Sequence, residues 1–227
     1  MTPAPVKASF SPVDAPENCA LCPRLVAFRH QNQEKYPTFF NKPVPSFGDP
    51  DPELLIVGLA PGLQGANKTG RPFTGDASGD LLFATLEKYG YMEGTFLSRA
   101  DDNVKLHNTL ITNAVRCVPP QNKTTAAEEA NCRPFLINQI SRPEKLKIIL
   151  ALGLVAHNAV LSTFGKTRAP YKFAHGALHD MGDCLSGTPI TLIDSYHCSR
   201  YNTNTGRLTE QMFEQVFQTI GNLLATR

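Results

Sequence analysis

The chain has 227 residues, 41% of them hydrophobic and 19% charged, with a net charge of +2 at pH 7. These proportions exclude a disordered or fibrous protein, and the length suits one medium α/β domain with a real core. The small charge permits a polyanionic partner without requiring one, and the lack of a long apolar run or signal-peptide pattern leads us to expect a cytoplasmic protein with no membrane contact.

The beginning of the chain is expected to be an arm that precedes one domain. Residues 1–17 are rich in proline and alanine and lack periodicity, so they are predicted to form a loose N-terminal arm. Residues 18–227 show no repeat and no interdomain linker, and are predicted to form a single domain. This domain begins with a Cys-x-x-Cys pair, Cys19 and Cys22, and a short helix that runs to His30.

A glycine-rich loop at 58–79 follows the first buried strand, 54–57, and leads into a helix that ends at Gly90. This order of elements is where α/β proteins place ligand sites, because glycines admit backbone amides close to a ligand and helix N-termini favour anions. The loop matches neither the phosphate-binding P-loop nor the dinucleotide pattern, since Lys68 and Thr69 precede its last glycines. A nucleotide-binding enzyme is therefore disfavoured.

The rest of the chain alternates apolar runs with helical patterns. Further strands are expected at 109–115, 147–153 and 189–194, further helices at 154–164 and after the capping residues Thr125 and Thr209, and irregular hairpin structure at 166–188. Four strands separated by helices predict an α/β fold with a mostly parallel four-stranded sheet covered on both faces. Ligands of such sheets bind beyond the carboxyl ends of the strands.

Four of the six cysteines have the spacing of metal ligands. Cys19 and Cys22 form one pair, while Cys117 follows a strand and Cys132 lies on the next helix. Clustered cysteines in a reducing compartment more often bind metal than form disulfides. The fourteen residues between Cys117 and Cys132 suit a zinc knuckle poorly. The spacing predicts a metal centre, leaves zinc and iron–sulfur open, and has unligated thiols as its alternative.

The loop at 58–79 resembles the first motif of the family 5 uracil-DNA glycosylases, the iron–sulfur branch of that superfamily. The segments 19–25, 117–125 and 129–136 resemble the cluster-binding segments of the same enzymes, and the resemblance spans roughly residues 19–217. It implies a three-layer α/β/α sandwich and a 4Fe–4S cluster with a structural role, since base hydrolysis moves no electrons. The implied ligands are Cys19, Cys22, Cys117 and Cys132, and Cys184 is expected to be an ordinary thiol.

The resemblance also implies an activity, the excision of uracil and other deaminated bases such as hypoxanthine from DNA. Such an enzyme flips the base out of the duplex, stabilises the departing base and places water against the sugar, leaving an abasic site. No lysine stands in a matched catalytic position, so a monofunctional glycosylase is expected. The expected partner is damaged double-stranded DNA, and the expected state is a monomer.

Two residues are candidates for recognition of the base. The ring of Phe73 is placed to stack on an extruded pyrimidine, although an isolated phenylalanine is more often part of the core. The amide of Asn113 is both donor and acceptor, as reading the N3–H and O4 edge of uracil requires, with a capping or network asparagine as its alternative. By resemblance, Gly58 and Ala60 of the first motif also contact the base.

Two further residues are candidates for the chemical step. A neutral imidazole at His197 would donate to O2 of uracil as charge develops on the base, with an ordinary surface histidine as the alternative. Asp76 is the carboxylate nearest Phe73 and is expected to orient water or offset the positive charge of the sugar. Its alternative is to cap the following helix.

The chain departs from relatives of the family at two motifs. The first motif reads Leu-Ala-Pro-Gly at 59–62 and lacks the polar residue that other branches use to activate water, which is the hallmark of family 5 and shifts attention to Asp76. The second motif is often His-Pro-Ser in relatives, but Cys198 stands after His197 here, which places the rigidity of the turn in question and suggests a redox-sensitive thiol. Arg200 and Tyr201 follow and are expected to contact DNA.

Two non-enzymatic functions also fit parts of the sequence. A nucleic-acid-binding module with iron–sulfur or zinc would keep the four cysteines and tolerate changes at Asp76, Asn113 and His197. A redox protein would require an exposed cluster that is reversibly reduced. Cysteine substitutions would harm all three functions and therefore separate them poorly.

Overall fold

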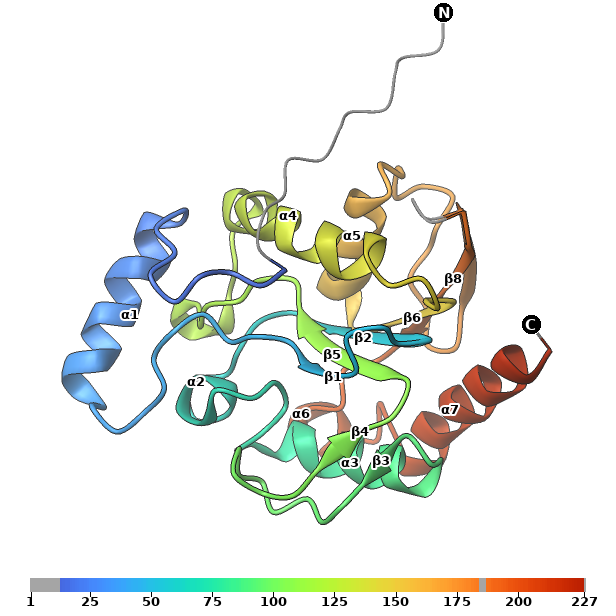
Figure 1. The fold of residues 1–227 in the computed structure, drawn as a ribbon, viewed down its shortest axis with the longest axis horizontal. Helices are drawn as coiled ribbons and strands as arrows, with labels where there is room; N and C mark the ends of the chain where they lie inside the picture. The colour runs from blue at the N-terminus through green and yellow to red at the C-terminus, as the bar shows by residue number, and fades with distance from the viewer. Residues whose placement is uncertain (1–12, 184–186, 227) are drawn as a thin grey trace, which may run out of the picture.

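The computed structural model describes residues 13–183 and 187–226, and within these residues the central sheet has six strands in the order β1-β5-β2-β6-β8-β7 (Figure 1). The four inner strands are parallel, and the two edge strands run antiparallel to their neighbours. The strands are β1 (Phe47–Gly48), β2 (Leu54–Gly58), β5 (Thr109–Asn113), β6 (Ile148–Leu152), β7 (Leu178–Asp183) and β8 (Pro189–Ser195).

The four core strands expected from apolar runs are confirmed, but the predicted strand number was too low. The two additional strands lie at the sheet edges. The edge strand β1 has only two residues, too few to show a period. The other, β7, alternates exposed and half-buried positions around a single buried residue, Met181, so it lacks the apolar signal of a core strand.

Helices cover both faces of the sheet, which confirms the three-layer α/β/α arrangement (Figure 1). Because β2 is buried on both faces, Leu54 and Ile56 pack toward α3 and α7, whereas Leu55 and Val57 pack toward α4 and α5. The covering helices are α3 (Ala77–Lys88), α4 (Ala126–Ser141), α5 (Leu154–Thr163) and α7 (Glu210–Ala225). None of the helices in the described ranges is long and apolar enough to span a membrane.

Capping residues begin the helices at the predicted positions. The Thr125 hydroxyl accepts from the Glu128 amide at 3.3 Å, and the Glu128 carboxylate accepts from the Thr125 amide at 2.9 Å, so α4 begins with a capping box. Thr209 accepts from the Met212 amide at 3.1 Å and begins α7. The remaining short elements are α2 (Ala66–Thr69), β3 (Met92–Glu93), β4 (Lys105–Leu106), the 3₁₀ turn Pro120–Asn122 and α6 (Arg200–Asn204).

The cysteine-bearing segment lies beside α4. Helix α1 (Pro23–Lys35) extends beyond the predicted end at His30, and Arg24 in its first turn binds both carboxylate oxygens of Glu128 at 2.8 and 2.7 Å. Of the predicted arm at 1–17, residues 1–12 lie outside the described part. Asp14 accepts from the Ser46 hydroxyl at 2.9 Å.

A buried ion pair fixes the glycine-rich loop. The Arg71 guanidinium donates to the two Asp102 oxygens at 2.6 and 2.7 Å and lies over the ring of Phe83 at 5.4 Å. Burial alone would raise the pKa of Asp102, but the bonds from Arg71 and from two backbone amides outweigh it and lower the pKa to about 2. The charged pair therefore holds the loop that carries Phe73.

We expect Asp102→Asn to lower the free energy of unfolding at pH 7 by about 3–5 kcal/mol, because it leaves Arg71 buried and unpaired. The stability contributed by Asp102 is present above its unfolded-state pKa of about 3.9 and is lost as the pH falls through its native value of about 2. Urea unfolding between pH 2 and 7 measures both. An equally steep fall in stability below pH 4 in the variant would contradict this role of Asp102.

Candidate active site

A cavity of about 330 Å³ opens at the carboxyl ends of the parallel strands. Its walls come from the loops that follow β2, β5 and β8, which is where sheets of this kind bind ligands. Four predicted residues, from three segments that lie far apart in the sequence, line it together: Phe73, Asp76, Asn113 and His197. The predicted base-binding residue Ala60 also lines this cavity.

Gly58, at the end of β2, allows two of these side chains to meet. A Cβ atom at this position would lie 2.5 Å from Oδ1 of Asn113 and 2.8 Å from Cζ of Phe73, closer than real Cβ contacts. The position therefore requires glycine for its close packing. Because Gly58 has no side chain, Asn113 and Phe73 can take the positions from which they line the cavity.

Phe73 serves both the core and the cavity. Its side chain packs in the core on the α3 and α7 side of the sheet, while its ring stacks on the His197 imidazole with centroids 5.8 Å apart. Its φ of 52° lies in the left-handed region, which is strained for a bulky residue. The core role expected as the alternative is thus met, and the same ring lines the cavity.

Asn113 ends β5 with a free amide. Asn113 is only 3% exposed, yet its side chain forms no hydrogen bond to another described residue of the protein. Buried amides nearly always have a partner, and this one lines the cavity. The amide is therefore available to a ligand, and the alternative of a network asparagine is not met in the described structure.

His197 faces the same space from the loop after β8. Burial lowers the pKa of its imidazole, while the negative charge of Asp76 raises it in part, so the ring is neutral at pH 7. Within the described residues its ring nitrogens have no hydrogen-bond partner in the protein. Stacking on Phe73 orients the ring and leaves its nitrogens for a ligand.

Cys198 holds the turn that carries His197. Its thiol is fully buried and donates to the Ser78 carbonyl at 3.2 Å, and the Asn202 amide donates to the His197 carbonyl at 2.8 Å. Burial raises the pKa of the Cys198 thiol to about 12. The turn is therefore anchored without the proline of the relatives, and the thiol is shielded and protonated, unlike a redox-sensitive cysteine.

Asp76 caps a helix and also lines the cavity. Its Oδ1 accepts from the Ser78 amide at 3.0 Å and begins α3, which confirms the capping alternative. Its Oδ2 points toward Gly65, where a Cβ would lie only 2.1 Å away, and the residue also lines the cavity. One oxygen is thus fixed by the helix, which holds the other in place.

Arg200 and Tyr201 lie outside the cavity. Both are in the first turn of α6, and Tyr201 is 72% exposed. They are close in sequence to His197 but face solvent at the surface. This position suits contact with a large ligand rather than with the occupant of the cavity.

The four predicted metal ligands gather in one small cavity between α1, the end of β5 and α4. Burial raises the pKa of the Cys117 thiol to about 12 and that of Cys132 to about 11, so these sulfurs require a positive partner to exist as thiolates. Donors already face them, because Arg29 Nη1 lies 3.8 Å from Cys117 Sγ and the Arg116 amide lies 3.3 Å from Cys132 Sγ. Such a site can hold a metal centre.

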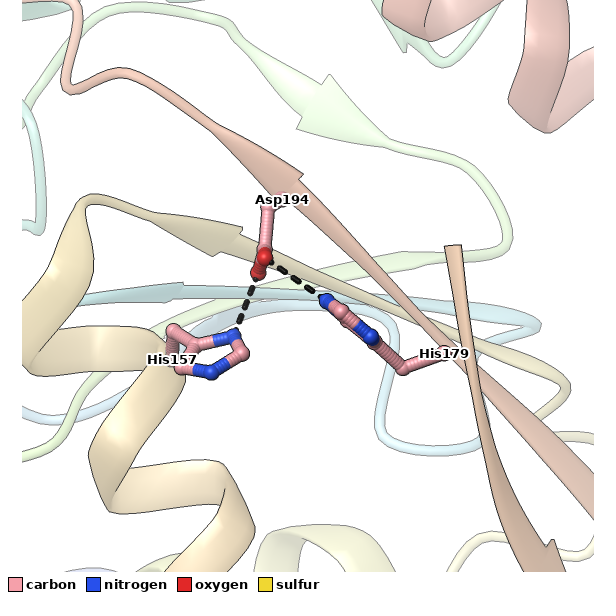
Figure 2. A group of neighbouring side chains, drawn as sticks. All are labelled: His157, His179 and Asp194. Carbon is pink, nitrogen blue, oxygen red and sulfur yellow. Dashed lines mark hydrogen bonds and ion pairs between the residues drawn. The ribbon is translucent and has the colours of Figure 1, made fainter. Parts of the chain in front are cut away.

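Three residues that sequence reasoning missed, His157, His179 and Asp194, form a cluster that includes a residue of the last strand, β8 (Figure 2). The Asp194 carboxylate is fully buried, and its oxygens lie 2.8 Å from His157 Nδ1 and 2.9 Å from His179 Nε2. The second nitrogen of His157 lies 3.0 Å from the Tyr171 carbonyl. These ligand types can also bind a metal ion, but every distance is that of an ordinary hydrogen bond and each carboxylate oxygen has a partner.

A signal for this cluster was present in the sequence. Asp194 is a carboxylate at the end of an apolar run, which requires a buried partner. Its partners come from α5 and β7, which lie far from it in the sequence. The partners of Asp194 could therefore not be predicted from the sequence without knowing the order of the strands in the sheet.

Comparison with known proteins points to one family. A family model described as the Uracil DNA glycosylase superfamily matches residues 45–221. The chain is 40% identical over 203 residues to the type-5 uracil-DNA glycosylase of Thermus thermophilus, covering 87% of this chain and 90% of the relative. It is 38% identical over 208 residues to the type-5 uracil-DNA glycosylase of Pyrobaculum aerophilum, covering 88% and 87%, respectively. A type-4 uracil-DNA glycosylase of the same organism is 33% identical over 155 residues, covering 68% and 70%.

We expect the His197 imidazole to titrate below the ordinary histidine pKa of about 6.5, because burial disfavours its charged form. In Asp76→Asn the midpoint falls further, since the carboxylate raises the pKa. NMR titration of the ring protons, assigned with His197→Gln, measures both midpoints. A value at or above 6.5, or a rise in the Asp76 variant, would show that burial does not control this group.

Proposed function

Because the chain belongs to the uracil-DNA glycosylase superfamily, we propose that its cavity receives a uracil flipped out of DNA and that the side chains around the cavity cleave the N-glycosidic bond. The protein is a uracil-DNA glycosylase, a glycosidase of base excision repair. The observation that carries the proposed roles is the meeting of Phe73, Asp76, Asn113 and His197 in one cavity. We propose that it works on DNA in the cytoplasm.

Phe73 and Asn113 select the base. The ring of Phe73 supplies a flat apolar face against which an extruded base stacks. Oδ1 of Asn113 accepts from N3–H of uracil, and Nδ2 donates to O4. Cytosine presents a donor where uracil has O4 and an acceptor where uracil has N3–H, so the same amide mismatches it.

The same pattern extends to hypoxanthine. Its N1–H and O6 present the donor and acceptor that N3–H and O4 present in uracil, whereas adenine reverses both. Asn113 therefore distinguishes deaminated bases from their parents, in pyrimidines and purines alike. A cavity of about 330 Å³ falls within the range of small-molecule sites and gives a purine room.

His197 and Asp76 serve the chemical step. The neutral His197 imidazole donates to O2 of uracil and stabilises the negative charge that develops on the departing base. Asp76 keeps one oxygen on the Ser78 amide, so the other has a fixed direction in which to orient water toward the sugar. No lyase step is part of this proposal, so the product is an abasic site.

The DNA lies over the surface around the cavity. Tyr201 is the most exposed of the large hydrophobic side chains described, and Arg200 precedes it on the same helix turn. We propose that Tyr201 contacts the gap that the flipped base leaves between the stacked bases of the duplex. We propose that Arg200 contacts a phosphate group of the DNA backbone. A duplex substrate and a monomeric enzyme complete the proposal.

The four cysteines hold a 4Fe–4S cluster in this proposal. It is supported by the meeting of all four cysteines in one small cavity and by the donors that face Cys117 and Cys132. When bound, the cluster supplies thiolate–iron cross-links rather than electrons for hydrolysis. Cys19 and Cys22 precede α1, Cys117 follows β5 and Cys132 lies on α4, so the residues tie three elements together.

We expect protein purified without oxygen to absorb broadly near roughly 400 nm, where thiolate-to-iron charge transfer occurs, and to contain about four iron atoms per chain. Cys132→Ser should lose the absorbance and the iron and lower Tm. Cys198→Ser is the matched control, because that residue is also buried but lies at the active site. Zinc in place of iron, or equal loss of iron in both variants, would contradict the cluster assignment.

The test of the catalytic proposal is single-turnover release of base from a duplex that carries one uracil. We expect His197→Ala and Asn113→Ala each to slow release by about 10²–10³-fold, the size of losing a donor to a developing anion. Both variants should retain Tm and bound iron. Unchanged rates in both would overturn the assigned roles, and DNA binding by intact protein without base release would favour a non-catalytic module.

Gly58→Ala tests the shape of the cavity. We expect it to abolish release under the same conditions, because the new Cβ would displace the Asn113 amide and the Phe73 ring. Gly221→Ala is the control, since its Cβ would meet nothing within 4 Å and the residue lies within α7. Wild-type rates in Gly58→Ala would show that the close packing is not needed.

A further inference from the structure

His175 binds the backbone amide of Tyr196, the residue that precedes His197. It lies in the loop between α5 and β7, and its Nδ1 is 3.2 Å from the backbone amide nitrogen of Tyr196. Its Nε2 is 3.2 Å from the carbonyl of Met212 on α7. The imidazole also stacks on the Tyr196 ring, with centroids 5.2 Å apart and planes at 25°.

The two backbone partners determine where the proton of this imidazole lies. A backbone amide only donates and a carbonyl only accepts. Nδ1 of His175 must therefore be the unprotonated nitrogen, and Nε2 must carry the hydrogen. Burial lowers the pKa of His175, and the Met212 carbonyl raises it in part, so the neutral form predominates at pH 7.

The Tyr196 amide lies where the last strand passes into the loop that carries His197. Just before it, the side chain of Asp194 is fixed by His157 and His179 (Figure 2), and its backbone is held by Gly176 and Ala177 at 2.8 and 3.0 Å. The last strand is thus pinned up to this residue. At the next peptide the Gly153 amide donates to the Ser195 carbonyl at 2.8 Å, and the Ser195 hydroxyl donates to the Tyr196 carbonyl at 2.9 Å. His175 binds the remaining group, the Tyr196 amide, and His197 follows.

The charged and titratable groups near His175 are few. Tyr196 stacks on it, and Arg207 lies 4.7 Å from the centroid of the Tyr196 ring. Ser195 Oγ is 3.4 Å from Nδ1, but its hydroxyl donates to the Tyr196 carbonyl at 2.9 Å. Met212 contributes only its carbonyl, and within the described residues no carboxylate forms an ion pair with His175.

We propose that His175 is a positioning residue for His197, which in its neutral form binds the Tyr196 amide and keeps the His197 imidazole directed into the cavity. A proton on Nδ1 removes the acceptor and leaves the Tyr196 amide unbound, so that the Gly153 amide on the Ser195 carbonyl alone holds that peptide. The inference rests on the proposed role of His197 in base release. It adds a second histidine, outside the cavity, whose protonation state controls the first.

His175→Asn and His175→Ala separate the contact from mere packing. Oδ1 of asparagine occupies nearly the place of Nδ1 and accepts from the Tyr196 amide, but asparagine cannot take up a proton there. We expect His175→Ala to release uracil about five- to tenfold more slowly at pH 7.5, the size of losing one neutral hydrogen bond. His175→Asn should stay within about twofold of the intact protein at that pH.

The pH dependence is the readout that packing alone would not produce. The rate ratio of intact protein to His175→Asn should fall as the pH drops below about 6.5, because only the intact protein loses its acceptor. Because His197 is present in both proteins, the effect of its own titration on the rate cancels in this ratio. His179→Gln is the control: it perturbs the Asp194 cluster, so it should lower Tm while retaining the pH profile of the intact protein.

A second measurement does not depend on activity. In ¹⁵N NMR spectra of the intact, cluster-containing protein, the Tyr196 amide should shift with the titration of His175, and this shift should vanish in His175→Asn. A Tyr196 amide that does not titrate, or matching pH profiles for intact protein and His175→Asn, would overturn the inference. A titrating amide in a protein that releases no base would instead sustain the contact and refute the proposed function.

Discussion

The missing side chain at Gly58 is the constraint on which the active site depends. It lets the amide at the end of β5 and the ring of Phe73 occupy space that any Cβ would fill. Phe73 accepts a strained backbone to reach that place, and its ring then orients His197 by stacking. The sheet supplies the meeting point, because parallel strands end at one edge. Base recognition and catalysis therefore share a single packing contact.

The ionisable groups around this contact are arranged to keep charge out of the cavity, except at Asp76. Burial keeps His197 neutral, and the Cys198 thiol behind it is protonated. The strong charges of the loop are paired away from the cavity, as Arg71 with Asp102. A neutral donor and one carboxylate suit a reaction in which the base becomes negative and the sugar positive, because each charge then meets a group prepared for it.

The sequence predicted the elements with strong local signals and missed those made by distant partners. Apolar runs located β2, β5, β6 and β8, and Thr125 and Thr209 marked helix starts, because these signals lie within a few residues. The edge strand β7 lacks such a run. Asp76 could not be assigned to one role because a capping carboxylate and a loop carboxylate look alike in sequence. The contacts of His179 with Asp194 and of His175 with the Tyr196 amide could not be predicted, because the fold brings these residues together from distant parts of the chain.

The central claim is that one cavity binds the base through Phe73, Asn113 and His197. A crystal structure of the protein with a duplex containing an abasic site, soaked with free uracil, tests it most directly. The account predicts uracil stacked on Phe73, its N3–H and O4 paired with the Asn113 amide and its O2 facing His197. Uracil bound elsewhere, or bound here with its N3–H and O4 edge turned away from Asn113, would contradict it.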